Sequence, residues 1–254
     1  MRSSQLRIDL NSDLGEGAGT DEQLLPLISS ANIACGGHAG DKASMAKTVR
    51  LSIEYGVGVG AHPSFPDREG FGRRAIRMNP EELRETLARQ MDALQSVADR
   101  FGVSVQHVKV HGALYNQAAA DPSLAALIGE TMRAINPGLI VVALAGSVMA
   151  DVLERIGVRV AREAFIDRGY AADGALVPRD RAHALVTEPH EAAFRAVRLA
   201  RDGLVAAEDG TEIAMQSDTL CIHGDNPSAV LLARAVRRAL GEAEITVTPM
   251  ASLV

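Results

Sequence analysis

The sequence contains no tryptophan, only two cysteines, and no apolar run that approaches the length of a membrane-spanning helix. Two cysteines are too few for the disulfide framework of a small secreted protein, so we expect a reduced, cytoplasmic protein. A membrane span needs about 18 or more consecutive apolar residues, and the N-terminus lacks the apolar core of a signal peptide. We therefore expect neither export nor membrane insertion.

Basic residues are also in deficit, because 26 Lys and Arg stand against 32 Asp and Glu and give a formal net charge of −6. A nucleic-acid partner would require a concentrated basic face, whereas the Lys and Arg residues are dispersed along the chain, so we expect no nucleic acid. The chain has no G-x-x-x-x-G-K-[ST] phosphate loop and no dinucleotide fingerprint. Local motifs therefore reveal neither an ATP site nor an NAD site.

What the sequence does contain is an alternation of apolar strand candidates with helical patterns, over a length of 254 residues. This alternation predicts an α/β fold with a parallel sheet, and the length suits a single barrel domain over residues 1–254. Each strand candidate runs into a cluster of Asp, Asn, His, Lys or Gly, where parallel α/β folds place their chemistry. The segments are 8–13, 33–38, 57–62, 105–111, 141–146, 164–168 and 220–226.

Three helix starts can be identified from an N-cap side chain followed by proline. They are Asn79-Pro80, Asp121-Pro122 and Asn226-Pro227. Further helices are expected over about 42–55, 147–156 and 188–202. The stretch 63–74 is too rich in Pro and Gly for a regular element, and we interpret it as a loop over the site.

Alternate residues of the first strand carry the polar groups Asp9, Asn11 and Asp13, so their side chains point to one side of the backbone. Two nearby carboxylates can hold a divalent cation, or can separate into an ionised base and a protonated acid. Alternatively, they only solvate the strand end and cap the next loop. Glu16 lies between two glycines and adds a further carboxylate.

His38 and His62 each end a glycine-containing strand. Together with Asp13 they could form a two-histidine, one-carboxylate metal site that leaves positions open for water or substrate. The alternative is that each is an ordinary polar histidine with a hydrogen-bond partner.

Lys109 and His111 alternate along the fourth strand and should project to the same side. A lysine inside a barrel needs an anion, either a carboxylate or phosphate on a ligand or one of the strand-end Asp residues. His111 could transfer a proton near neutral pH.

Two later strand ends complete the candidate set. Asp167 and Arg168 follow the sixth strand, and His223 and Asp225 follow the seventh, where Asp225 could orient a histidine or contact a ligand. For Asn226 the stronger interpretation is a cap of the last helix.

Five motifs make the chain similar to a known family. They are Leu10-Asn11-Ser12-Asp13-Leu14-Gly15-Glu16, the segment from Ala31 to Asp41, the segment from Gly60 to Asp67, His111-Gly112-Ala113-Leu114-Tyr115-Asn116, and Cys221-Ile222-His223-Gly224-Asp225-Asn226-Pro227. In this order they resemble the LamB/YcsF family, and the resemblance extends from Arg7 to Pro249. The chain departs from the family at Val110, where the family usually has proline between the lysine and the histidine.

The resemblance implies a seven-stranded variant of the (β/α) barrel, like that of glycoside hydrolase and deacetylase proteins. It also implies the ATP-dependent opening of the lactam of 5-oxoproline to glutamate, together with separate B and C subunits and with Mg²⁺ as the counter-ion of ATP. Asp13 would be the base or a metal ligand, Lys109 would neutralise an anionic group, and His62 or His111 would transfer the proton.

The remaining candidates would contact the substrate: Asn11, Glu16, His38, Asp167, Arg168, His223 and Asp225. Two other functions stay open. The chain could be a self-sufficient metal-dependent deacetylase or amide hydrolase, with Asp13, His38 and His62 as ligands, or a subunit that captures 5-oxoproline without performing chemistry.

Overall fold

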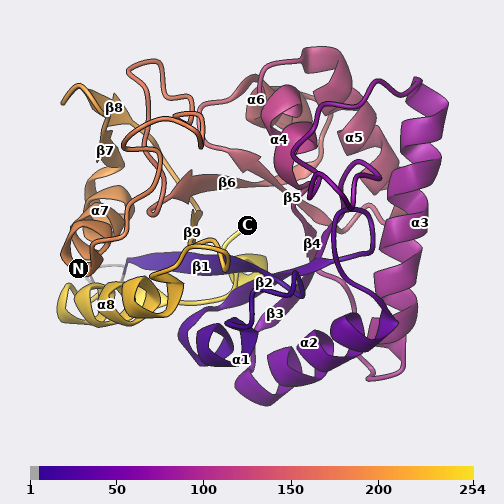
Figure 1. Cartoon of the computed structure of the whole chain (residues 1–254), viewed down its shortest axis with the longest axis horizontal. Coiled ribbons are helices and arrows are strands. Elements are labelled where there is room, and N and C mark those ends of the chain that lie inside the picture. Colours follow the sequence, from indigo (N-terminus) through magenta and orange to yellow (C-terminus); the bar gives the residue numbers. More distant parts are fainter. Residues whose placement is uncertain (1–5) are drawn as a thin grey trace.

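The computed structural model describes residues 6–254, in which seven parallel strands close into a barrel (Figure 1). The barrel closes because β1 pairs with β2 along one edge and with β9 along the other. The strands in barrel order are β1 (Arg7–Leu14), β2 (Ser30–Ala34), β3 (Gly58–His62), β4 (His107–Val108), β5 (Ile140–Leu144), β6 (Arg159–Phe165) and β9 (Thr219–Cys221). The predicted fold class is confirmed, and residues 1–5 of the expected domain lie outside the described part.

The helices form a ring around the strands (Figure 1). They are α1 (Asp21–Leu24), α2 (Lys42–Tyr55), α3 (Pro80–Asp99), α4 (Gly112–Ala118), α5 (Pro122–Ile135), α6 (Val148–Arg155), α7 (Pro189–Asp202) and α8 (Ala229–Glu242), with the 3₁₀ turns η1 (Leu25–Leu27) and η2 (Met250–Ser252). Within residues 6–254, none of them combines the length and the apolar character that crossing a membrane requires.

Two of the three predicted helix starts are confirmed. Asn79 accepts the backbone N–H of Glu82 in a capping box, and Asp121 caps α5 through the N–H groups of Ser123 and Leu124. These caps satisfy donors that have no partner within the helix.

The third predicted start is wrong, since α8 begins at Ala229 and Ser228 is its N-cap residue. Asn226 is buried, and its side-chain amide donates to the Val186 carbonyl and to Asp167. Its Oδ1 accepts the backbone N–H of Ser228, so Asn226 caps the turn before α8 rather than the helix itself.

Three short strands were not predicted from the sequence. β7 (Leu204–Ala206) and β8 (Glu212–Ala214) form an antiparallel hairpin beside the barrel, and β10 (Thr246–Val247) pairs with the start of β1. Each has only two or three residues, which is too short for a period-two pattern to be distinguished from a loop.

The bottom of the barrel is closed by the C-terminal turn. Met250 of η2 packs against Ile140, Val142 and Ala161 in a small apolar cluster, and Figure 1 shows the C-terminus near the centre of the ring. The interior above this cluster is polar. Because β1 alternates, Asp9, Asn11 and Asp13 point inward at three successive levels, and all three side chains are buried.

Asp9 is a structural residue rather than part of the mouth. Its carboxylate accepts the hydroxyl groups of Ser29, Ser30 and Thr219 and the backbone N–H of Met250, and so joins four segments of the chain. Burial raises the pKa of Asp9 to about 6, although these hydrogen bonds act in the opposite direction.

We predict that Asp9→Asn changes how stability depends on pH. The folded state keeps a proton on Asp9 that the unfolded state has already lost, so the wild type loses stability as the pH rises from about 4 to about 6. The rise of this pKa from 3.8 to about 6 corresponds to about 3 kcal/mol. Urea unfolding of both proteins at pH 4 and pH 7 measures the effect, and the stability of Asp9→Asn relative to the wild type should increase by about that amount. A difference that does not vary with pH would contradict the assignment.

Candidate functional site

The carboxyl ends of the barrel strands surround a cavity of about 760 Å³. Of the eleven candidate residues, eight line it: Asp13, Glu16, His62, Lys109, His111, Arg168, His223 and Asp225. The other three, Asn11, His38 and Asp167, lie behind this layer and hydrogen-bond to residues in it or below it. The structure therefore brings most of the candidate residues together around one cavity, and their contacts divide into three groups.

The first group surrounds the ammonium of Lys109. Its Nζ lies 2.8 Å from Glu163 Oε1 and 3.1 Å from Asp13 Oδ1, and it contacts Cys221 Sγ at 3.1 Å. The side chain is buried, so the two carboxylates supply the anions that a buried ammonium requires. The sequence left two kinds of anion open for Lys109, a ligand or a strand-end Asp, and the structure shows the strand-end residue Asp13.

Glu163 was missed, although its position carried a signal. It is a charged, fully buried position between Ala161 and Phe165 on the inward side of β6, and its carboxylate accepts Asn11 Nδ2 and the Tyr115 hydroxyl as well as Lys109. A charged side chain in an apolar strand with inward parity is the pattern that would have identified it.

Asp13 is held ionised by these neighbours. Although burial opposes ionisation, the charges of His62 and Lys109 hold the pKa of Asp13 well below its ordinary value. The same pairing acts on Lys109, whose pKa lies well above its ordinary value because the attraction of Asp13 outweighs the effect of burial. Asn32 Nδ2 donates to Asp13 Oδ1 and fixes the orientation of the carboxylate.

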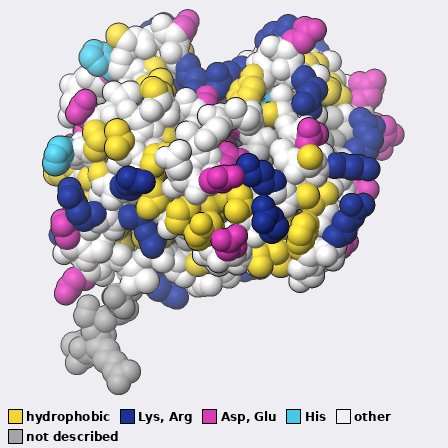
Figure 2. All heavy atoms as spheres, turned by 60° about the horizontal axis from the view of Figure 1, so that its bottom comes forward, with side chains coloured by type: hydrophobic (Ala, Val, Ile, Leu, Met, Phe, Trp, Pro, Cys, Tyr) yellow, Lys and Arg dark blue, Asp and Glu magenta, His cyan; other side chains and the backbone are white. Residues whose placement is uncertain are grey.

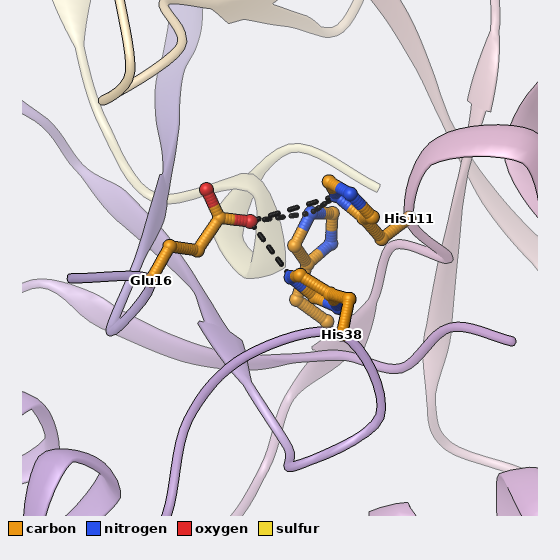
Figure 3. Close-up of side chains that lie close together, drawn as sticks. Glu16, His38 and His111 are labelled. Carbon is orange, nitrogen blue, oxygen red and sulfur yellow. Dashed lines mark hydrogen bonds and ion pairs between the residues drawn. The ribbon is translucent and has the colours of Figure 1, made fainter. Parts of the chain in front are cut away.

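The second group is a cluster of three histidines around Glu16, which Figure 3 shows with Glu16 pointing toward His38 and His111. Glu16 Oε1 lies 2.8 Å from His38 Nε2, 3.5 Å from His111 Nδ1 and 3.7 Å from His62 Nε2. His62 Nε2 and His111 Nδ1 are 2.9 Å apart. Asp13, which the sequence grouped with His38 and His62, contacts His62 Nε2 at 3.3 Å.

Burial shapes the charges of this cluster. It raises the pKa of Glu16 to about 7 and lowers the pKa of His38 to about 3. Burial also holds the pKa of His111 well below its ordinary value. His62 differs, because the charge of Asp13 outweighs the effect of burial and raises its pKa.

The loop over residues 63–74 holds the histidine rings from above, as expected. Phe71 adopts a left-handed backbone conformation with φ 53°, and its carbonyl accepts His111 Nε2 at 2.9 Å. Gly72 follows with φ +64°, and a Cβ there would lie 2.8 Å from His111 Cδ2 and 2.9 Å from His38 Cβ. Only glycine allows the loop backbone to approach both rings this closely.

The third group lies on the opposite side of the mouth. Asp167 accepts the backbone N–H of His223 and contacts its Nδ1 at 2.9 Å, so Asp167 rather than Asp225 orients this histidine. Asp225 forms ion pairs with Arg73 and Arg179 at the rim. Arg168 is buried and donates to the carbonyls of Ala184 and Val177, which anchors the loop above the cavity.

The molecular surface shows no single-sign field on the face drawn in Figure 2, where Lys and Arg side chains alternate with Asp and Glu. The charge that is concentrated lies inside the cavity. Among the residues described above, Asp13 and Glu163 contact the ammonium of Lys109, and Glu16 adds a third carboxylate beside His62.

Comparisons with known proteins agree with this architecture. Residues 8–254 match the profile of the LamB/YcsF family. The A subunit of 5-oxoprolinase from Heliobacterium modesticaldum is 46% identical over 247 residues, which cover 95% of this chain and 97% of that protein. The corresponding A subunit from Methylococcus capsulatus is 48% identical over 248 residues, covering 96% of this chain and 95% of that protein.

Solved structures show the same similarity. A lactam utilization protein from Thermus thermophilus superimposes with a TM-score of 0.89 at 44% identity, covering 96% of this chain and 99% of the other. The peptidoglycan deacetylase PdaC from Bacillus subtilis has a TM-score of 0.52 at 14% identity, over 98% of this chain and 90% of the other. This second likeness concerns the fold alone.

We predict that Lys109→Met destabilises the protein by about 3–5 kcal/mol, because it leaves two buried carboxylates without their cation. Lys47→Met is the matched control, since Lys47 pairs with Glu22 at the exposed surface and its loss should leave stability nearly unchanged. Urea unfolding measures both. Adding Glu163→Gln to Lys109→Met should restore part of the loss, and a double variant as unstable as the sum of the single variants would contradict the pairing.

Proposed function

The chain belongs to the LamB/YcsF family, and on this basis we propose that it is the A subunit of an ATP-dependent 5-oxoprolinase. The proposal rests on one observation above all: relatives that carry the name of this 5-oxoprolinase component share 46–48% of their residues with it over almost the full length of both chains. In this proposal the chain acts in the cytoplasm with separate B and C subunits, and opens the lactam of 5-oxoproline to release glutamate.

The size and polarity of the cavity suit this substrate class. At about 760 Å³ it is larger than a five-membered lactam needs, so it also has room for a phosphoryl group on the lactam oxygen. The rim arginines Arg73 and Arg179 line it and carry the positive charge that the substrate carboxylate or a phosphate would meet.

The chemistry explains why ATP would be needed. A lactam is a resonance-stabilised amide, and phosphorylation of its oxygen would turn that oxygen into a good leaving group. This transfer from ATP would release ADP. Water would then add to the ring carbon, and the C–N bond would break as the nitrogen takes up a proton. The resulting acyl phosphate would be hydrolysed by a second water to glutamate and phosphate. The chain has no phosphate-binding loop of the G-x-x-x-x-G-K-[ST] type, so the proposal assigns the use of ATP and Mg²⁺ to the assembled enzyme.

Within this scheme we assign the base to Asp13. It lines the cavity, it is held ionised by Lys109, and its Oδ2 lies 3.3 Å from His62 Nε2. A water molecule between Asp13 and the ring carbon would lose its proton to the carboxylate, while His62 or His111 would return a proton to the ring nitrogen. Lys109 has both carboxylates already in contact, so we assign it the role of orienting Asp13 in addition to neutralising an anionic group.

We predict that glutamate release from 5-oxoproline requires the complete mixture of this chain, the B and C subunits, ATP and Mg²⁺. The measurement is a drop-out series in which each component is omitted in turn. Loss of turnover in every omission supports the proposal. Turnover by this chain alone without ATP would instead identify a stand-alone metal-dependent amide hydrolase, the second function that the histidine cluster favours.

We further predict that Asp13→Asn lowers kcat by at least about 100-fold in the reconstituted enzyme, since it removes the proton acceptor while preserving the shape of the side chain. Asp209→Asn, in the exposed turn of the β7–β8 hairpin, is the matched control and should leave kcat unchanged. The two variants are compared by initial rates at saturating 5-oxoproline and ATP. A loss of less than about tenfold in Asp13→Asn would remove Asp13 from the role of base.

A further inference from the structure

The hydrogen bonds around His62 and His111 determine where the protons of these two rings lie. His62 Nδ1 is 2.6 Å from the backbone carbonyl of Lys109, and His111 Nε2 is 2.9 Å from the carbonyl of Phe71. A carbonyl oxygen can only accept, so each of these nitrogens carries a proton and donates it. In a neutral imidazole the other nitrogen then presents a lone pair.

The two remaining nitrogens face each other. His62 Nε2 and His111 Nδ1 lie 2.9 Å apart with their rings at 84°, and Glu16 Oε1 is within 3.7 Å of both. Three electron-pair donors that converge in a buried place repel one another unless a cation, either a proton or a metal ion, lies among them. Donors about 2.1 Å from a tetrahedral metal ion lie about 3.4 Å from each other, and the separations of 2.9, 3.5 and 3.7 Å bracket this value.

His38 belongs to the cluster in a different capacity. Its ring is stacked on that of His111, with centroids 3.8 Å apart and an angle of 7° between the planes. A metal ion lies close to the plane of an imidazole that binds it, and one ion cannot lie in two parallel planes. His38 Nε2 instead donates to Glu16 Oε1 at 2.8 Å, and His38 does not line the cavity, whereas Glu16, His62 and His111 all do.

The local charge also favours a divalent cation. Asp13, Glu16 and Glu163 carry three negative charges when ionised, and Lys109 supplies one positive charge, so the buried set has a net charge of −2 with neutral histidines. A second group of possible ligands, Asp13 with Cys221 and His223, already has a cation among its members. The ammonium of Lys109 already lies 3.1 Å from both Asp13 and Cys221 and fills that place.

We propose that His62 Nε2, His111 Nδ1 and the carboxylate of Glu16 bind one divalent transition-metal ion of the Zn²⁺ class, and that His38 orients Glu16. Two imidazoles and one carboxylate match the preference of such ions and leave a coordination position open toward the cavity. Of the ligand set expected from the sequence, this assignment retains His62, replaces Asp13 by Glu16, adds His111, and makes His38 a positioning residue through its hydrogen bond.

The test uses Co²⁺ as a spectroscopic probe on the full chain alone, after treatment with a chelator. We expect one Co²⁺ per chain, with the intense visible absorption of a four- or five-coordinate ion, and displacement of the Co²⁺ by added Zn²⁺. His111→Ala should abolish this binding. Glu16→Gln preserves the shape of the side chain and should strongly weaken Co²⁺ binding. The test therefore does not depend on a single variant that folds poorly.

The positioning role of His38 has its own readout. His38→Ala should retain the coordination spectrum but bind Co²⁺ about 10- to 100-fold more weakly, as expected when a group that orients a ligand is removed. His190→Ala, which removes an exposed histidine of α7, is the matched control and should bind like the wild type. Thermal unfolding of each variant, followed by circular dichroism, verifies that it is folded.

Two outcomes would overturn the proposal. If the chain binds no Co²⁺, the cation between His62 and His111 is a shared proton. If His38→Ala abolishes binding while His111→Ala does not, the ligand set is wrong. The metal proposal goes beyond the proposed function, and with the ion bound it replaces the proton-transfer role that was given to His62 or His111, because the cavity-facing nitrogens of both rings then bind the metal. It is tested without the B and C subunits, ATP or 5-oxoproline, so its failure is distinguishable from the absence of oxoprolinase activity.

Discussion

The polar interior of this barrel depends on one buried ammonium, that of Lys109. It lies between Asp13 of β1 and Glu163 of β6, two strands that both pair with β9, and either carboxylate alone would be a costly buried charge. The backbone of Lys109 also positions a neighbouring side chain. Its N–H donates to the Ala61 carbonyl, and its own carbonyl accepts the Nδ1–H of His62. One residue therefore helps His62 to keep Asp13 ionised and also orients the ring of His62. The two groups that a hydrolytic site needs, an ionised carboxylate and an oriented imidazole, are consequences of one position at the end of a strand of only two residues.

The layers below this ion pair make its geometry rigid. Asn11 donates to Glu163 and to Thr219, and Thr219 donates to Asp9, so each inward residue of β1 is bonded to neighbouring strands. A seven-stranded barrel has a narrow interior, and Gly60 of β3 provides space for the ring of His107, since a Cβ there would lie 2.0 Å from His107 Nε2. In a polar interior this narrow, nearly every donor finds an acceptor at short range. The mouth of the barrel is consequently preorganised by hydrogen bonds rather than by apolar packing.

How much of this was accessible from the sequence depends on whether a contact is local. Strand ends, the caps at Asn79 and Asp121, and the inward parity of Asp13 and Lys109 follow from periodicity and local chemistry, and the structure confirms them. The partners of these residues do not follow, because pairing across a barrel joins positions about a hundred residues apart, as between Asp13 and Lys109. Asn226 shows the opposite failure. A local rule predicted a helix cap, but Asn226 Oδ1 caps only the turn before α8, and its side-chain amide bonds to Asp167 and Val186, which no local pattern indicates.

The histidine cluster shows a further limit on motif reasoning, since its protonation is set by groups that have no side-chain signature. The carbonyls of Lys109 and Phe71 determine which nitrogen of His62 and of His111 faces the cavity. Phe71 reaches this position only through a left-handed backbone conformation, which is costly for a bulky residue and is stabilised here by the packing of its ring against His38 and His111. The loop over residues 63–74 thus contributes to the site through main-chain oxygens and through the small size of Gly72. Two proteins could share every histidine of this cluster and still present different nitrogens to a cation, if their loops directed these carbonyls differently.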